Sequence, residues 1–566
     1  MQYVVAVVFV VLIDCLFLSP VSAKSTETPP FHLCQDAHQI YHNATFITLD
    51  PQKPRAEAVA VIHHRLAAVG DEKTIMEKCR GSHTEIIDLK KAYVTPGFID
   101  SGSLLVLYGW LANHSIDLST TNTFHQKNWK PIKTTDMFLS TLADKISASN
   151  EQQIIVYGYD STRLKGEPLT QNKLNKISKD KTIVVFYSSE QSALLNDKAA
   201  REIKELDPTI AIDEEGKINS KDFQSFLVSI LGKNKLEKAI MTAIDFFSSQ
   251  GYTTISENQF HPAWLDTYAR IINNDSPVDV IFNASNLWHI KLLNLVQKDF
   301  KRFYSGYYIL KIDGSLGDYA AYLSAPYSFP PIGYDRSWRG SLAISPRKME
   351  EQVITAAKEK ISLAFEAHGD AAIDVALNMT QKTQQKHPHF KPKLLNAQVI
   401  RKDQFQRMNY LSMSASWFAP HLYYWGEAMC HEIVGPERAH FNNPLRQAKK
   451  SFNTISMYAN APVTPLQPLK MMQRMQTRKV QSWQYPLNRN CPQYYAPHQR
   501  ISAEDALRAI TIDNALFYGL EKEKGTLEVG KLADMTLLSA DPLTPSGNSS
   551  IKVLGTISRG QLHMNL

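Results

Sequence analysis

Short apolar runs separated by turn residues occur at both ends of the chain. Runs with the alternation of β-strands lie at residues 44–49, 58–62, 66–69, 85–89, 535–538 and 553–557. Gly525 and Gly530 supply turns within the C-terminal set. Neither end has enough strands to enclose a core alone, so we predict that residues 24–95 and 521–566 form one composite β-sandwich domain.

Between these ends, from residue 96 to about 520, short apolar runs alternate with longer amphipathic segments. The predicted strands are 154–156, 183–186, 253–256, 280–283, 308–312, 362–366, 394–399, 413–417 and 454–458. Helical periodicity lies between them, for example at 236–249 and 346–360. Repeated alternation of strand and helix over this length is typical of a parallel α/β barrel.

Composition places the chain among globular proteins. It has 566 residues, of which 43% are hydrophobic and 21% charged, so it has enough apolar residues for a large core. This length suits a barrel with a smaller second module. The formal net charge of +7 is a weak bias over such a length, and we therefore predict no nucleic-acid partner.

The first 23 residues have the pattern of a secretory signal peptide. An apolar run occupies residues 4–13, and small residues at 19–23 precede Lys24 as a cleavage site would. The run is shorter than the roughly 20 apolar residues that span a bilayer. We predict that residues 1–23 are cleaved and that the protein is secreted or periplasmic. The alternative is an uncleaved N-terminal segment, which is the only membrane contact that the sequence predicts.

The cysteines agree with export. Cys15 lies in the predicted signal peptide, which leaves Cys34, Cys79, Cys430 and Cys491. An even number of cysteines in an exported chain is typical of one or two disulfides. Of the three pairings, proximity in the chain favours Cys34–Cys79 with Cys430–Cys491, whereas four buried free thiols are the alternative.

Several short motifs follow one another between about residues 40 and 545. They are Pro96-Gly97-Phe98-Ile99-Asp100-Ser101, Asp313-Gly314-Ser315, Gly369-Asp370, Ala397-Gln398, His421-Leu422-Tyr423-Tyr424-Trp425-Gly426, Gly435-Pro436-Glu437-Arg438, Ala461-Pro462-Val463 and the segment 525–534. In this order they resemble the amidohydrolase superfamily, in particular its amidohydrolase-3 branch. The resemblance implies an α/β fold with a (β/α)8 TIM-type barrel over residues 96–520 and the composite β-sandwich. It also implies hydrolysis of non-peptide carbon–nitrogen bonds with one or two divalent metals, such as zinc, at the C-terminal ends of the barrel strands.

The same resemblance implies that the metal-binding and catalytic positions have been replaced. Relatives carry histidines, a lysine and an aspartate where this chain has Gly102, Leu104, Ile309, Glu366, Asn396 and Asn460. Gln191 stands where the resemblance implies a further histidine. Glycine, leucine and isoleucine side chains have no lone pair for a metal, and an amide does not accept a proton at neutral pH. We predict that the six positions converge on one cavity at the C-terminal ends of the strands.

Other polar or ionisable side chains near these positions are candidates for the pocket. The pocket candidates are Gln191, Lys311, Asp313, His368, Asp370 and His421. Glu366 and His421 are weak candidates for a rebuilt metal site, and the alternative is a buried ion pair between Lys311 and Glu366 on neighbouring strands. His421 begins an aromatic run and is either a pocket wall or a packed loop residue.

Two classes of function therefore stay open. By resemblance the protein is a carbon–nitrogen hydrolase. By its residues it is a catalytically degenerate member, a pseudoenzyme without a cofactor, that uses the old pocket to bind a small-molecule ligand or a partner. The alternative is an active hydrolase with a rebuilt, atypical metal site. The metal content of the purified protein distinguishes the two.

Overall fold

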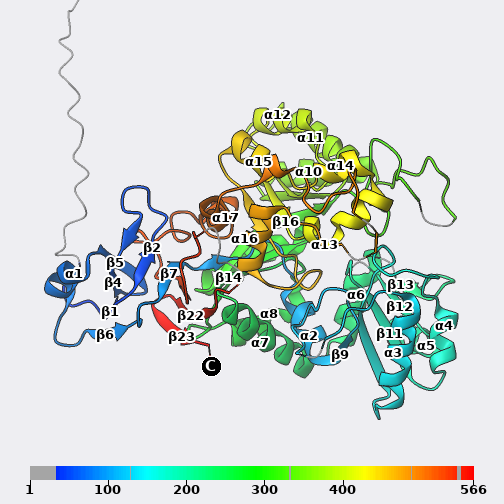
Figure 1. The fold of residues 1–566 in the computed structure, drawn as a ribbon, viewed down its shortest axis with the longest axis horizontal. Helices are drawn as coiled ribbons and strands as arrows, with labels where there is room; N and C mark the ends of the chain where they lie inside the picture. The colour runs from blue at the N-terminus through cyan, green and yellow to red at the C-terminus, as the bar shows by residue number, and fades with distance from the viewer. Residues whose placement is uncertain are drawn as a thin grey trace, which may run out of the picture.

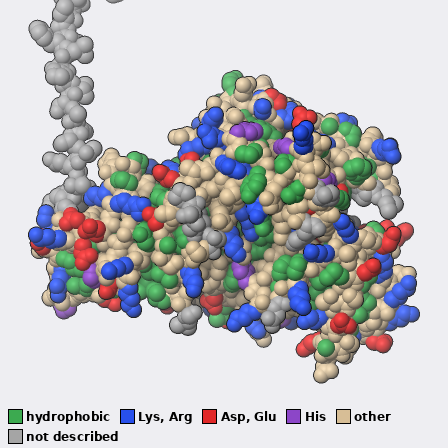
Figure 2. All heavy atoms as spheres, in the orientation of Figure 1, with side chains coloured by type: hydrophobic (Ala, Val, Ile, Leu, Met, Phe, Trp, Pro, Cys, Tyr) green, Lys and Arg blue, Asp and Glu red, His purple; other side chains and the backbone are tan. Residues whose placement is uncertain are grey.

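The structure, a computed structural model, describes residues 34–127, 129–190, 192–218, 220–330, 333–482, 484–485, 487–544 and 550–565. The predicted signal peptide and the pocket candidate Gln191 lie outside the described residues. Figure 1 shows a β-sandwich at the left, a barrel at the centre and a further lobe at the lower right. In the described part of the chain, no helix is long and apolar enough to cross a membrane. On the face in Figure 2, basic side chains are scattered and acidic ones lie among them.

Both chain ends build the β-sandwich. One sheet has the order β5-β4-β1-β6, from β1 (Gln39–His42), β4 (Ala58–Ile62), β5 (Arg65–Gly70) and β6 (Glu85–Asp88). The other has the order β23-β22-β21-β7-β2-β3, from β2 (Thr45–Ile47), β3 (Arg55–Ala56), β7 (Tyr93–Pro96), β21 (Met535–Leu538), β22 (Val553–Ser558) and β23 (Gln561–Met564). Strands β7 and β21 pair antiparallel, with Val94 opposite Leu537. The predicted composite sandwich is confirmed.

The sandwich has one apolar core to which both chain ends contribute. Phe46, Val59 and Val94 from the N-terminal strands pack in it with Met535 and Ile557 from the C-terminal strands. All five are fully buried, as expected where every second residue of a strand faces inward. Each end therefore buries its apolar face only against the other.

Eight parallel strands form the barrel. They are β8 (Phe98–Ile99), β14 (Tyr252–Glu257), β15 (Asp279–Ala284), β16 (Phe303–Lys311), β17 (Leu363–Ala367), β18 (Lys393–Asn396), β19 (Ala415–Phe418) and β20 (Ser456–Tyr458). The first and last strands are bridged by Asn514, whose Nδ2 donates to the carbonyl oxygens of Ile99 at 2.6 Å and Met457 at 2.9 Å. The predicted TIM-type barrel is confirmed.

Helices accompany the barrel strands. The predicted helix 236–249 lies within α7, and the predicted helix 346–360 corresponds to α10, which ends two residues earlier. The main ones are α7 (Lys233–Ser249), α8 (Leu265–Ile271), α9 (Leu287–Val296), α10 (Pro346–Lys358), α11 (Asp370–Gln384), α12 (Lys402–Tyr410), α13 (His421–Ala428), α15 (Leu445–Phe452), α16 (Pro468–Thr477), α17 (Ala503–Ala509) and α18 (Ile512–Tyr518). Local sequence accounts for their ends. The Ser345 side chain accepts a hydrogen bond from the Lys348 amide at the start of α10, and Pro346 occupies the first turn.

The predicted strands 154–156 and 183–186 belong to a separate lobe and not to the barrel, which corrects the prediction. They lie in β10 (Gln153–Tyr159) and β11 (Thr182–Tyr187) of a five-stranded sheet with the order β13-β12-β11-β10-β9. The other strands are β9 (Ser115–Asp117), β12 (Ala193–Leu195) and β13 (Lys217–Ile218). Helices α3 (Thr135–Ser147) and α4 (Gln171–Ile177) pack on one face, and α5 (Asp197–Leu206) and α6 (Ser220–Ile230) on the other. A strand's periodicity does not reveal which sheet it joins.

Two disulfides occur in the described residues. They join Cys34 to Cys79 and Cys430 to Cys491. This is the pairing that proximity in the chain favoured, and the alternative of four free thiols is wrong. The first disulfide ties the end of α1 (Glu72–Cys79) to the residues before β1.

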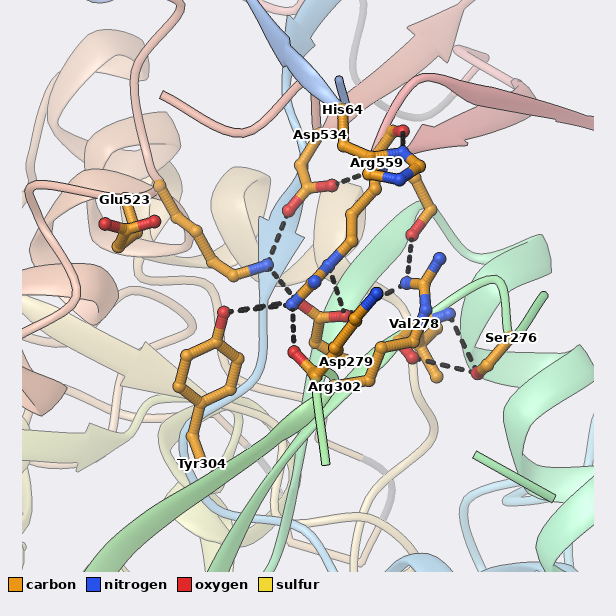
Figure 3. A network of polar contacts seen from close by, with 12 residues as sticks. His64, Ser276, Val278, Asp279, Arg302, Tyr304, Glu523, Asp534 and Arg559 are labelled. Atoms are coloured by element: carbon orange, nitrogen blue, oxygen red, sulfur yellow. Dashed lines mark hydrogen bonds and ion pairs between the residues drawn. The ribbon is translucent and has the colours of Figure 1, made fainter. Parts of the chain in front are cut away.

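A buried network of charges joins the sandwich to the barrel (Figure 3). Its centre is Asp279 at the start of β15, which forms ion pairs with Arg302 at 2.9 Å, Lys524 at 2.6 Å and Arg559 at 2.8 Å. Lys524 also contacts Asp534 at 2.5 Å. Asp279 and Arg302 belong to the barrel, whereas the other members come from the C-terminal segment, so this network fixes one domain against the other.

Candidate functional site

A cavity of about 60 Å³ lies at the C-terminal ends of the barrel strands. The C-terminal loops of parallel barrel strands meet at one face, which explains why residues distant in sequence surround it. The lining includes Glu366, His368, His421, Trp425 and Asn460 from the barrel, and Tyr159, Asp160 and Tyr187 from the lobe.

The cavity wall contains a contact between His368 and Glu366. The Nε2 atom of His368 lies 3.3 Å from Glu366 Oε1, and its Nδ1 lies 2.7 Å from Gln398 Oε1. Burial opposes a charge on the ring, but the hydrogen bond to Glu366 and the charge of Asp313 raise the pKa of His368 above its ordinary value. Burial also raises the pKa of Glu366, but the His368 hydrogen bond and the charge of Lys311 outweigh it and lower that pKa. The contact between the two residues therefore stabilises the charged form of each.

The predicted ion pair between Lys311 and Glu366 is wrong. The two residues lie directly opposite each other on β16 and β17. Yet across the residues that the structure covers, Lys311 has no carboxylate within ion-pair distance, and Glu366 contacts His368 instead. The reason is local: Glu366 and His368 are two residues apart at the end of β17, so their side chains point to the same side of the strand and come into contact.

Asp313 and Asp370 hold the loops behind the cavity and do not line it. Asp313 accepts hydrogen bonds from the backbone amides of His368 and Gly369, each at 2.9 Å, and burial raises its pKa to about 6. Asp370 accepts from the Ser324 amide at 2.9 Å and from Arg401 at 3.1 Å. Both therefore position the segment that carries His368.

His421 forms part of the cavity wall. Its ring stacks on Trp425, with centroids 5.2 Å apart and planes 9° from parallel. Burial, and then the charges of His368 and Arg163, lower the pKa of His421 to about 3, so the ring is neutral. Trp425 Nε1 donates to Asp160 at 2.8 Å, which ties this wall to the lobe. Asp160 was missed from the sequence because none of the family motifs includes it.

A tyrosine covers the position of Gly102. A Cβ atom on Gly102 would lie 2.3 Å from the ring of Tyr458. The Tyr458 hydroxyl donates to Asn396 Oδ1, and Asn396 Nδ2 lies 3.1 Å from His368 Nε2. The buried Tyr458 side chain thus contacts two of the replaced positions: its ring packs against Gly102, and its hydroxyl is hydrogen-bonded to Asn396. Tyr458 ends the predicted strand 454–458 and lies two residues before Asn460, but the sequence did not single it out.

The structure brings only part of the predicted set to the cavity. Glu366 and Asn460 line the cavity. Asn396 does not line it but contacts His368, which does. Leu104 is buried in the main apolar core at the start of α2 (Leu105–His114). Ile309 is also absent from the wall, since it packs in a deeper layer with Leu395 and Phe517. It lies two residues before the end of β16, and therefore below the rim of the barrel.

Gly102→Ala is expected to lower the free energy of unfolding by about 1–3 kcal/mol, the usual range for overpacking. The reason is that the new methyl group overlaps the Tyr458 ring, which the hydrogen bond to Asn396 holds in place. Urea denaturation of both proteins measures the difference. Gly317→Ala is the matched control, because a Cβ there would meet no atom closer than 3.6 Å. Equal stability of the two variants would contradict the packing described.

The donors at the cavity do not fit a catalytic metal site. Within the described ranges, no three His, Cys, Asp or Glu side chains form a group that could hold a metal ion. Catalytic zinc usually has three protein ligands. Of the two weak candidates, Glu366 contacts His368, and the ring of His421 stacks on Trp425. The described residues therefore do not present the three converging ligands of a usual catalytic zinc site.

Known proteins are similar to this chain over most of its length. Protein LONG AFTER FAR-RED 3 of Arabidopsis thaliana is 24% identical over 98% of this chain and 96% of its own. N-substituted formamide deformylase of Arthrobacter pascens is 23% identical over 88% of this chain and 93% of its own. A crystal structure of an uncharacterized metal-dependent hydrolase from Pyrococcus horikoshii OT3 superposes with a TM-score of 0.70 at 23% identity, covering 90% of this chain and 99% of that one.

The sequence profile of the Amidohydrolase family matches residues 85–563. The match includes the whole barrel, the lobe and the C-terminal strands of the sandwich. Since it extends over far more than half of the chain, the chain belongs to the amidohydrolase family.

Proposed function

We propose that this protein is an exported amidohydrolase-family member that no longer performs metal-dependent hydrolysis of carbon–nitrogen bonds and uses the barrel cavity to bind a small polar molecule. The observation that carries the proposal is the position of Tyr458. Its ring occupies the space above Gly102, and its hydroxyl engages Asn396, so a packed tyrosine stands where the family would hold metal ligands.

The composition of the cavity supports binding. One wall offers the carboxyl group of Glu366, whose pKa is lowered, the ring of His368, whose pKa is raised, and the neutral ring of His421. A volume of about 60 Å³ is far below the roughly 300–1,000 Å³ of pockets for drug-sized ligands. The cavity therefore suits a compact ligand with hydrogen-bonding groups of both kinds.

A second function is a hydrolase with a rebuilt metal site. The observation in its favour is that Glu366, His368 and His421 line the same cavity. For this function, His368 would need to lose the proton that its contact with Glu366 stabilises. Because of this requirement, we favour the ligand-binding function over a hydrolase with a rebuilt metal site.

Elemental analysis of the dialysed protein is the test. We expect substoichiometric zinc, manganese and iron, and no hydrolysis of N-formyl or N-acyl amides. One metal per chain, lost together with activity in Glu366→Gln, would establish the rebuilt hydrolase instead. Glu350→Gln is the matched control, since this half-buried glutamate pairs with Lys382 on the surface of α10 and α11.

Two disulfides support the proposed export, because they persist mainly in oxidising compartments. N-terminal sequencing of the same protein, purified from its source, tests this part of the proposal. The mature chain should begin near residue 24 if the signal peptide is cleaved.

A further inference from the structure

The lobe contains a second cavity, which is larger than the one in the barrel. Its volume is about 730 Å³, within the roughly 300–1,000 Å³ of small-molecule sites. It lies on the face of the lobe sheet that α5 and α6 cover, beside α2 and the start of α7 (Figure 1, lower right). Neither the family motifs nor the barrel cavity includes any of its residues.

The floor of this cavity is apolar. It is lined by Trp110 of α2, Ile155 and Val184 of the sheet, Ile203 of α5 and Phe226 of α6. Trp110, Val184, Ile203 and Phe226 are buried. Trp110 and Phe226 also take part in a row of rings through Phe186, with centroids 5.5 and 5.8 Å apart. A floor of this kind favours an aliphatic or aromatic group.

The mouth of the cavity carries charges of both signs. Its titratable groups are His114 at the end of α2, Glu151 before β10, Glu202 of α5 and Lys235 of α7. Glu202 is already engaged, since the Thr182 hydroxyl donates to it at 2.6 Å and Lys198 lies at 3.8 Å. Burial, and then the charges of Lys235 and Lys238, lower the pKa of His114, which therefore remains neutral.

Glu151 and Lys235 are the remaining charges at the mouth. Both side chains are exposed. In the described part of the chain, neither forms an ion pair with another side chain. The mouth thus offers one free anion and one free cation above an apolar floor.

We propose that this cavity binds a zwitterionic small molecule with a large apolar side chain, a free hydrophobic amino acid being the simplest member of the class. Its ammonium group would face Glu151, its carboxylate would face Lys235, and its side chain would contact Trp110 and Val184. The site is separate from the barrel cavity, so it does not depend on the function proposed there.

Four probes that share an indole ring test the proposal by calorimetry on the full mature protein. Tryptophan carries both charges, tryptamine only the cation, indole-3-propionate only the anion, and 3-methylindole neither. We expect tryptophan to bind most tightly, with each singly charged probe weaker by about tenfold, the loss for one charge-assisted contact. Equal affinities for all four, preference for a singly charged probe, or no binding of tryptophan would overturn the proposal.

Surface variants locate the site. Glu151→Gln and Lys235→Gln should each weaken tryptophan binding by about tenfold, whereas Val184→Phe should abolish it by filling the floor. The matched controls are Glu205→Gln and Lys233→Gln, which change exposed charges of α5 and α7 that do not line the cavity. If the controls weaken binding as much as Glu151→Gln and Lys235→Gln, the charge positions proposed here are wrong.

Discussion

Asp279→Ala is expected to lower the free energy of unfolding by about 3–5 kcal/mol, the range observed when one partner of a buried ion pair is removed. The substitution leaves the side chains of Arg302, Lys524 and Arg559 without the carboxylate that they share (Figure 3). Lys524 keeps Asp534, but Arg302, which is 2% exposed, keeps no carboxylate partner among the described residues. Three cations around one missing anion explain the size of the effect.

The measurement is urea denaturation, followed by fluorescence and by far-UV circular dichroism. Asp275→Ala is the control, because this exposed aspartate lies in the loop before β15 and takes part in no ion pair that the structure describes. A loss below about 1 kcal/mol in Asp279→Ala, similar to that of a surface ion pair, would contradict this account. Separate unfolding of sandwich and barrel in the variant would further show that the network couples them.

Glu257 is expected to make stability fall as pH rises from 4.5 to 7. Burial raises its pKa from the ordinary 4.5 to about 7. Between these values the native carboxyl is protonated and the unfolded one is not, so the native state binds more protons. Its contribution to stability is complete below pH 4.5 and declines by up to about 1.4 kcal/mol per pH unit until pH passes 7.

The hydrogen bonds of Glu257 show why the group is buried. Its oxygens accept from the amides of Val106 at 3.0 Å and Gln259 at 2.8 Å, which fixes the first turn of α2 against β14. Glu257→Gln keeps a neutral group of the same shape, so its stability relative to the parent protein should rise between pH 5 and pH 8. The exposed Glu205→Gln should leave the pH profile unchanged. Parallel profiles of Glu257→Gln and the parent would show that Glu257 does not titrate in this range.

The two cavities differ in what they imply for function. The barrel cavity is small, and its groups are already engaged with one another, as in the contact between His368 and Glu366. The lobe cavity is larger and has free charges at its mouth. If both proposals hold, the protein has two binding sites: the barrel cavity takes a compact polar ligand, and the lobe between β8 and β14 takes an apolar zwitterion.

Much of the fold was predictable from the sequence. Strand periodicity located the barrel strands from residue 253 onward. Each chain end has too few strands to enclose a core alone, which predicted that the two ends share one, and the pairing of β7 with β21 confirms this. The motifs at 96–101 and 525–534 then identified the family. These features are local in sequence, since alternation and turn residues act within a few positions.

The lobe could not be separated from the barrel in this way. Strands β10 and β11 have the same apolar pattern as the barrel strands. They differ from the barrel strands in the strands with which they pair: β10 pairs with β9, and β11 pairs with the antiparallel strand β12. Pairing between distant strands depends on tertiary packing, which periodicity does not record.

The site shows the same division. The sequence by itself determined which side chains are present: no ligand atoms at Gly102 and Leu104, and a carboxylate at Glu366. Only the tertiary structure decided what those side chains do. It directed Glu366 to His368 and not to Lys311, and it placed the Tyr458 ring over Gly102. The physical reason is that a side chain's partners are set by loop geometry and by the space that neighbouring strands leave, and these arise only when the barrel closes.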